Sequence, residues 1–230
     1  MFRASRLNPS PFLRAAVFAV LGLALAAIPA MAAANEPHPI DIGAARQMPL
    51  GTVVTVEGSV TVPSGDFSSS SFDEGFAIQD HTGGIYVSVA TNLGLTVRQR
   101  VLVTGQLVDS FGLLTLVPAS DGDVEVRGHA RRVEPLWVRT GTVGPANQGR
   151  LVRVVGVITQ PVVPDPPFGE KVFVDDGSGP IRVFVNTSTG IDVSALAQGQ
   201  LLSVVGFSSA FNDPEIDPRF QSDLRQPAHP

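Results

Sequence analysis

Alternating apolar and polar positions mark two short strands near the middle of the first half of the chain. Phe76 and Ile78 alternate with polar or small residues, and Ile85 and Val87 do the same a few positions later. The residues between them, Asp80–Gly84, are polar and rich in glycine. Period-two alternation is typical of half-buried strands, and glycine tolerates the positive φ values that tight hairpin connections need. The pattern therefore predicts a β-hairpin.

The same hairpin pattern returns about a hundred residues later, over Val172–Val185. Aligning Asp80 with Asp176 places Ile85 on Ile181. The flanks repeat as well, with glycines seven residues apart before each hairpin: Gly51 and Gly58, then Gly149 and Gly156. Self-similarity of this kind indicates one structural unit present twice.

Each copy has the order strand, long loop, hairpin, short connector, strand, turn, strand. Five strands with a connector between the third and fourth is the order of the OB-fold, a small Greek-key barrel. We therefore expect an all-β protein of two tandem five-stranded OB-like Greek-key barrels after a signal peptide. The expected segments are 1–34 for the signal peptide, 45–127 for the first barrel and 134–224 for the second, with residues from Gln221 onward as a tail.

The hairpin carries a resemblance to a known class of proteins. The residues Phe76-x-Ile78-x-Asp80-x-Thr82-Gly-Gly-Ile85-x-Val87 resemble the strand–turn–strand motif of nucleic-acid-binding OB-folds. Similar motifs occur in the anticodon-binding type and in OB modules of secreted bacterial nucleases. The resemblance covers both copies and implies a ligand face across the second and third strands, framed by the loops 1–2 and 4–5.

That resemblance implies a set of candidate ligand-binding residues, most of them aromatic or basic. Aromatic rings stack on bases, and cations follow phosphates. Phe111 and Phe211 recur in matching turns. The full set is Phe67, Phe72, Gln79, Tyr86, Phe111, Phe168, Lys171, Arg182, Phe184 and Phe211.

Strand parity divides the candidates further. Tyr86 and Arg182 have the opposite parity to the apolar residues beside them, so we expect both to be exposed. Phe76 and Phe173 are expected to be core residues, and Trp137, the single tryptophan, is expected to pack on the second core. For the loop residues Phe67 and Phe72, ligand contact and packing over a barrel end both stay open.

The amino terminus has a different composition. Arg3, Arg6 and Arg14 precede or begin an apolar run that ends near Ile28, and small residues follow up to Ala34. This is the layout of a secretory signal, with an apolar segment short for a membrane span. We expect a periplasmic or secreted bacterial protein without a stable membrane span after cleavage; an uncleaved anchor is the alternative.

Charge narrows the expected ligands. Without the three leader arginines, 13 basic residues remain against 21 acidic ones, a net charge of −8. Such a charge repels polyanions, and a phosphate-driven binder usually shows a basic stripe. The first hypothesis is a binding protein for single-stranded nucleic acid or oligonucleotides that relies on stacking. The alternative is a protein- or oligosaccharide-interaction module without nucleic-acid binding.

Residues suited to catalysis or metal binding are scattered. Asp80, Asp175 and Asp176 lie in Gly-rich turns, where Asp usually accepts hydrogen bonds from turn amides. The acidic groups Asp73-Glu74 and Asp213-x-Glu215-x-Asp217 could gather calcium, but solvated surface carboxylates are the simpler reading. No nucleophile elbow, metal-binding His pair or phosphate loop occurs. We expect no enzyme activity, metal or cofactor. The sequence also has no cysteine, so no disulfide can form.

Overall fold

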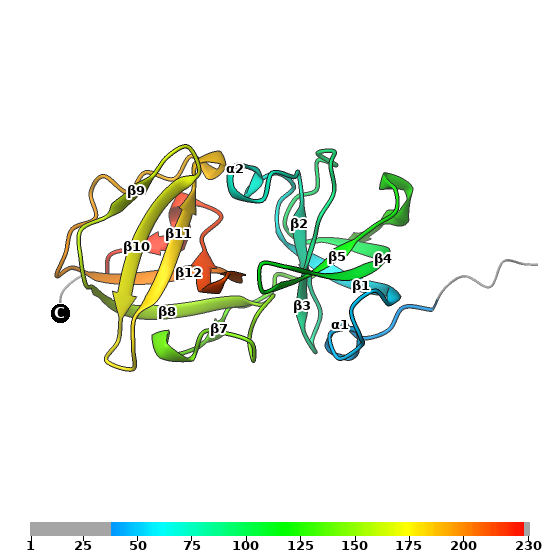
Figure 1. Cartoon of the computed structure of the whole chain (residues 1–230), viewed down its shortest axis with the longest axis horizontal. Coiled ribbons are helices and arrows are strands. Elements are labelled where there is room, and N and C mark those ends of the chain that lie inside the picture. Colours follow the sequence, from blue (N-terminus) through cyan, green and yellow to red (C-terminus); the bar gives the residue numbers. More distant parts are fainter. Residues whose placement is uncertain (1–37, 228–230) are drawn as a thin grey trace, which may run out of the picture. The chain divides into compact units, whose positions relative to one another are not determined.

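The computed structural model describes residues 38–227, and these belong to one compact unit. They form two closed β-barrels joined in tandem (Figure 1). The expectation of two OB-like barrels is therefore confirmed. The expected signal peptide lies outside the described residues, and the expected segment boundaries stay predictions.

The first barrel closes a sheet of five strands in the order β1-β2-β3-β5-β4, with β4 pairing back onto β1. The β3–β5 pair is parallel and the other pairs are antiparallel. A sixth strand, β6, extends the sheet beyond β4. The elements are α1 (Ile42–Ala45), β1 (Val53–Val62), α2 (Ser68–Ser71), β2 (Phe76–Gln79), β3 (Gly84–Val87), β4 (Gln99–Ser110), β5 (Leu113–Val117), η1 (Asp121–Asp123) and β6 (Val124–His129).

The second barrel repeats this topology with β8, β10, β11, β13 and β12, and β12 pairs with β8 to close it. The β11–β13 pair is again the parallel one. The elements are β7 (Leu136–Trp137), η2 (Thr140–Thr142), β8 (Leu151–Ile158), β9 (Val163–Asp165), β10 (Gly169–Asp175), β11 (Ile181–Asn186), η3 (Thr187–Thr189), β12 (Leu201–Phe211), β13 (Asp213–Asp217), η4 (Gln221–Asp223) and β14 (Leu224–Arg225).

Strand register confirms the internal alignment. Ile78 pairs with Ile85 in the first hairpin, and Val174 pairs with Ile181 in the second. All four side chains lie in the two barrel cores. The cores are built almost wholly from the period-two apolar positions, which is why the pattern predicted the strands well.

Three expectations about packing are wrong. Phe173 lies on the outer face of β10, because Val172 and Val174 on either side of it point into the core. Trp137 is exposed; its ring packs under the Arg153 guanidinium, 5.1 Å from the ring centroid. The expected tail instead begins with η4 and with β14, which pairs with β12.

The two turn aspartates have the structural role that the sequence suggested. Asp80 accepts hydrogen bonds from the amides of Thr82 and Gly83 at 2.7 Å each. Its other oxygen accepts from the amide of Ile42, at the start of α1, at 2.8 Å. Asp176 repeats this arrangement, because it accepts a hydrogen bond from the Thr140 amide of η2 and another from within its own turn. Each turn therefore holds in place the short helix that precedes its barrel.

The barrels contact each other through a small apolar cluster. Phe207, from the outer face of β12, packs against Phe67 and Tyr86 of the first barrel, with ring centroids 6.1 Å apart in both cases. Val62 and Ala77 complete the cluster, and Leu113 packs at its edge. Because all these side chains except Leu113 are buried, the contact is a continuous apolar interface.

Hydrogen bonds surround that cluster. Gln79 Oε1 accepts from the Leu151 amide at 2.8 Å in a buried position, and Arg219 donates to the carbonyl of Thr61 at 2.7 Å. Gly84 and Gly149 approach so closely that a Cβ on Gly84 would lie 1.9 Å from the Gly149 carbonyl oxygen. Only glycine fits this crossing, which fixes β3 against the segment before β8.

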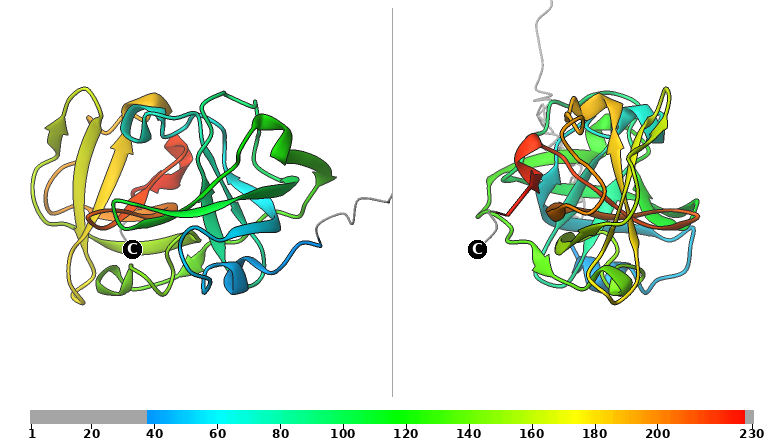
Figure 2. Two further views of the ribbon diagram at one scale, coloured as in Figure 1. Left: turned by 45° about the vertical axis from the view of Figure 1, so that its right-hand side comes forward. Right: turned by 90° about the vertical axis from the view of Figure 1, so that its left-hand side faces the viewer.

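The tips of two hairpins also meet. Figure 2 shows the β4–β5 hairpin (green) beside the β12–β13 hairpin (orange to red) in both views. The Asn212 amide donates to the Phe111 carbonyl at 2.7 Å, and the Phe111 and Phe211 rings are 5.1 Å apart. Both phenylalanines come from the matching turns that the sequence singled out.

Within residues 38–227, no helix has both the length and the apolar character needed to cross a membrane.

Candidate functional site

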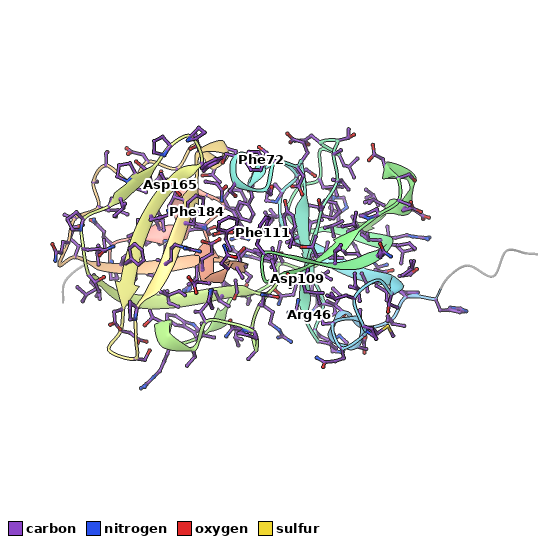
Figure 3. All side chains as sticks on the ribbon, in the orientation of Figure 1. Arg46, Phe72, Asp109, Phe111, Asp165 and Phe184 are labelled. Atoms are coloured by element: carbon purple, nitrogen blue, oxygen red, sulfur yellow. The ribbon has the colours of Figure 1, made fainter. Side chains whose placement is uncertain are left out.

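A cavity of about 820 Å³ lies between the outer faces of the two barrels. Its first wall comes from β3, β5 and the loop that contains α2, and its second wall from β10, β11, β12 and β13. Its volume is within the usual range for small-molecule sites, which is roughly 300–1,000 Å³. Figure 3 marks Phe72, Phe111, Phe184 and Asp165 in this region, with side chains from both barrels among them. The cavity is the candidate ligand site.

Aromatic rings dominate the cavity lining. Phe72 packs edge-on against Phe168 across the barrels, with centroids 5.6 Å apart. Phe72, Phe111 and Phe211 are 80%, 63% and 51% exposed, so their faces are open to a ligand. Phe184 lies deeper and is buried. Exposed aromatic groups cost free energy in water, and their gathering around one hollow is typical of a binding site.

Backbone strain gathers at the same place. Four described residues other than glycine have a positive φ, and three of them, Phe72, Phe111 and Asn212, line the cavity. The left-handed conformation costs such residues about 1 kcal/mol or more. Here it directs the Phe72 side chain outward at the end of α2 and the Phe111 side chain outward at the turn between β4 and β5. Strain of this kind is often retained at functional sites.

The cavity is rich in carboxylates. Among the described residues that line it, six are acidic and two are basic. Both basic side chains are already paired: Lys171 with Asp165 at 2.6 Å, and Arg182 with Glu215 at 2.6 Å. The remaining acidic residues are Asp73, Asp109, Asp213 and Asp217. The site therefore offers hydrogen-bond acceptors and negative charge rather than free cations.

Two of these carboxyl groups are buried in the second barrel's wall. Burial raises the pKa of Asp217 well above its usual range, and the neighbouring Glu215 raises it further. Burial also raises the pKa of Glu215, although Arg182 opposes that effect. Asp217 Oδ1 has no hydrogen-bond partner within residues 38–227. Both residues were expected to be solvated surface acids or calcium ligands, and the solvated reading is wrong because parallel pairing to β11 places them between the barrels.

The first barrel's wall holds a hydrogen-bonded pair opposite them. Tyr86 donates from its hydroxyl to Asp73 Oδ1 at 2.7 Å. Asp73 also accepts from the Gly75 amide at 3.1 Å and from the Ser88 hydroxyl. Burial, and then the charge of Asp73, raise the pKa of Tyr86 well above its usual value. Tyr86 is therefore a neutral hydrogen-bond donor held in one orientation.

The expectation that Tyr86 is exposed is wrong, because this residue is only 5% exposed. Its ring lies over Ala77, its cross-strand partner, and its hydroxyl sits so close to Gly75 that a Cβ there would lie 2.3 Å away. Phe207 then covers it. Small residues on the neighbouring strand, such as Ala77 and Gly75 here, leave room for an outward aromatic side chain to lie flat on the sheet. They therefore indicate that such a ring packs on its own sheet. Arg182, also expected to be exposed, is half-buried by its pairing with Glu215.

The structure brings nine of the ten candidate residues to this one cavity. Gln79 is the exception, since its side chain is buried at the Leu151 amide. Two of the nine, Phe67 and Tyr86, are buried in the apolar cluster between the barrels, which leaves little of their surface for a ligand. The others that line the cavity are Phe72, Phe111, Phe168, Lys171, Arg182, Phe184 and Phe211. Their roles in ligand binding stay predictions.

Sequence reasoning missed Phe207, Asp73, Glu215 and Asp217 as parts of the site. The last two carried a signal, since Asp213, Glu215 and Asp217 have period two and therefore share one strand face. What the sequence could not indicate was that a second barrel covers that face.

Asp41, Asp80 and His81 lie close enough for their ligand atoms to fall within 4.8 Å of one another. Asp80 already accepts four hydrogen bonds from Ile42, Thr82 and Gly83, including one from the Thr82 hydroxyl. Its oxygens are therefore committed to the turn, and this group is explained as a structural cap.

Comparisons with known proteins add little to this geometry. No protein family model matches the chain, and no curated protein does. Among solved structures, the hypothetical protein ygiW from E. coli is 16% identical over 39% of this chain and 89% of its own, with a TM-score of 0.30. A murine DNA-binding protein bound with double-stranded DNA is 12% identical over 76% of this chain and 97% of its own, with a TM-score of 0.38. A replication protein A heterotrimer bound to single-stranded DNA is 12% identical over 84% of this chain and 52% of its own, with a TM-score of 0.33. At such low TM-scores these likenesses carry no conclusion about ligand or function, which must rest on the site.

Proposed function

We propose that this chain is a binding protein without enzyme activity, and that it holds its ligand in the cavity between the two barrels. The observation that carries the proposal is the composition of that cavity. Open phenyl faces, strained residues and buried carboxyl groups from two barrels converge on one hollow of about 820 Å³. The buried apolar cluster between the barrels supports a preformed site.

The charges of the cavity favour an oligosaccharide as the ligand. Both lining cations are engaged by carboxylates, so neither is free to hold a phosphate. Surplus carboxylates accept hydrogen bonds from hydroxyl groups, and phenyl rings pack on the apolar faces of sugar rings. OB barrels use the face of strands 2 and 3 for oligosaccharides as well as for oligonucleotides. A hydroxyl-rich ring ligand without phosphate groups suits this lining best.

Single-stranded nucleic acid is the second candidate. The exposed rings of Phe72, Phe111 and Phe211 support it, because stacking on a base contributes about 1–3 kcal/mol per ring and tolerates any sequence. The acidic lining and the net charge of the chain oppose it. Any such binding would weaken steeply with salt, since phosphate contacts release counterions.

One titration separates the two candidates. The protein from residue 35 onward would be titrated with neutral oligosaccharides of several linkages and with labelled single-stranded DNA and RNA, at low and at high salt. We expect saturable, salt-insensitive binding of an oligosaccharide that is weakened by Phe72→Ala and Phe184→Ala. Trp137→Ala is the matched control, because Trp137 is an exposed aromatic residue outside the cavity lining.

Other outcomes would change the assignment. Salt-sensitive binding of a single strand, lost in Phe111→Ala and Phe211→Ala, would favour nucleic acid. Binding of neither class would contradict a cavity ligand of these kinds and direct attention to a protein partner.

We further propose that the chain is exported to the periplasm or secreted, and that the leader is cleaved near residue 34. The arginines, the apolar run and the small residues before Asn35 support this proposal. Amino-terminal sequencing of the protein recovered from outside the cytoplasm should begin near residue 35. Recovery of the intact chain from the membrane fraction would contradict cleavage.

A further inference from the structure

The strongest unexplained feature of the cavity is Asp217. Its side chain lines the wall, the residue is only 4% exposed, and Oδ1 has no hydrogen-bond partner in residues 38–227. A buried polar atom left without a partner costs about 1–3 kcal/mol, so such atoms usually serve a ligand, a water or a proton. A feature this costly at the wall of a cavity calls for an occupant.

No lining cation is available to Asp217 without breaking another pair. Arg182 donates to Glu215 at 2.6 Å and to the Phe211 carbonyl at 3.0 Å, and Lys171 is held by Asp165. Arg182 lowers the pKa of Asp217, but its effect is the weakest of those that act on this group. Among the described residues, the carboxyl group therefore has no positively charged partner of its own.

The surroundings suit a positive group that arrives with the ligand. Phe184 and Phe207 are buried aromatic residues in the same lining, and Asp73 stands in the opposite wall. Ammonium groups are attracted both to aromatic faces and to carboxylates, and these attractions strengthen where water is excluded. A hydroxyl group would also form hydrogen bonds with the carboxylates. It carries no positive charge, however, so the aromatic ring faces would not attract it as they attract an ammonium group.

We propose that the wall formed by Glu215 and Asp217 is a subsite for a protonated amine. This inference rests on the proposed oligosaccharide function and deepens it: the ligand would carry an amino group, as a glucosamine-type sugar does. A free polyamine presents the same chemistry, so the ammonium group is the shared element and the experiment separates the two sources.

Proton linkage supplies an independent signature. Burial and Glu215 keep the pKa of Asp217 high, while Ser209 and Arg182 oppose them, and Tyr86 and Asp73 face the site from the first barrel. The raised pKa favours the protonated form of this carboxyl group. An entering ammonium group stabilises the carboxylate, so the proton leaves to the buffer, and an ammonium–carboxylate pair forms with no other change in bonding. Binding of a neutral sugar releases no such proton.

The test compares three ligands on the same protein by calorimetry. These are a glucosamine oligomer, its fully N-acetylated counterpart and spermidine, each measured in two buffers with different ionisation enthalpies. We expect the amine-bearing oligomer to bind about 10-fold more tightly than the acetylated one, the size of one charge-assisted contact. We also expect proton release with the amine only.

The variant Asp217→Asn should bring the two oligomers to nearly equal affinity and abolish proton release. Asparagine is close in shape to aspartate and carries no charge, so we expect this variant to fold normally. Asp213→Asn is the matched control, since Asp213 lines the same cavity but is exposed. It should keep most of the preference.

Each outcome bears on a different claim. Equal binding of both oligomers without proton release would overturn the amine subsite and leave the oligosaccharide function intact. Spermidine binding that depends on Asp217, with no oligosaccharide binding, would support the subsite and overturn the oligosaccharide function. Failure of all three ligands to bind would overturn both.

Discussion

The two barrels are copies of one unit, yet they use the same outer face differently. In the first barrel Ala77, Tyr86 and Thr115 lie side by side on that face and are buried, with Phe207 packed over the Tyr86 ring. The aligned positions in the second barrel, from β10, β11 and β13, are larger or charged. They are Phe173, Arg182 and Glu215.

This difference shows how a duplicated fold divides its tasks. Inward positions must stay apolar in both copies because each barrel needs its own core. Outward positions on the strand 2–3 face are free to differ, and here the first copy has uncharged residues at them and serves as a docking surface. The other copy has charged and aromatic groups at these positions, and the two barrels supply nearly equal shares of the cavity lining.

The largest expected effect tests the docking surface. Phe207→Ala removes a ring that is 1% exposed and packed against Phe67 and Tyr86, so we expect a loss of about 3–5 kcal/mol in the free energy of unfolding. Gln106 occupies the corresponding strand position in the first barrel and is exposed. Gln106→Ala should cost no more than about 0.5 kcal/mol. Urea denaturation of both variants measures the difference, and equal losses would contradict the asymmetry.

A smaller effect should appear at the two turn aspartates. Asp80→Ala leaves the amides of Ile42, Thr82 and Gly83 without an acceptor, and we expect a loss of about 1–3 kcal/mol. Asp176→Ala should cost less, because Asp176 is exposed. Thermal unfolding of both variants beside the parent protein gives the ranking, and a larger loss at Asp176 would contradict it.

The Asp80 effect should also depend on pH. Burial pushes the pKa of Asp80 upward, but hydrogen bonds from Thr82, Ile42 and Gly83 outweigh it and lower the pKa. A lowered folded-state pKa stabilises the protein above the unfolded value of about 4, and this contribution is lost as the pH falls through the folded pKa. The gap between Asp80→Ala and the parent should therefore narrow below pH of about 4. A gap that stays constant would rule out the ionic contribution.

The smallest expected effect compares the two long loops. Asp165 in the second barrel has a salt bridge to Lys171, whereas Asp66 in the first barrel has a buried Oδ2 with no hydrogen-bond partner in residues 38–227. Burial raises the pKa of Asp66 to about 7, with Asp223 adding to the effect and Arg219 opposing it. The folded state thus binds an extra proton between pH of about 4 and 7, and its stability falls as the pH rises through that window.

Asp66→Asn should remove that fall. Midpoints of thermal unfolding at several pH values would show it, with the variant gaining on the parent protein as the pH approaches 8. Asp165→Asn is the control, and it should show no such gain. A parallel pH dependence in parent and Asp66→Asn would contradict the assignment.

The sequence predicted the strands because each apolar residue at period two had to enter a barrel core. Ile78, Ile85, Val174 and Ile181 illustrate this, and the repeat made the register of one copy a check on the other. Most of the aromatic and basic residues that line the candidate cavity could be singled out, because the turns and strands that bear them could be placed on a known barrel order; their roles in binding stay predictions. Phe173 was misplaced by one residue because both it and its neighbours are apolar; the alignment of Asp80 with Asp176 puts Val172, and not Phe173, at the position of Phe76.

By itself, the sequence determined two barrel cores, their strand order and the turns that Asp80 and Asp176 hold. Only the tertiary structure decided what becomes of the outward residues. Tyr86 and Gln79 have strand parity that suits solvent, but a second barrel buries them, while Glu215 and Asp217 become the wall of a cavity. The physical reason is that core packing follows the local period of the strands, whereas burial between the barrels depends on contacts between residues far apart in the sequence, such as Gln79 and Leu151.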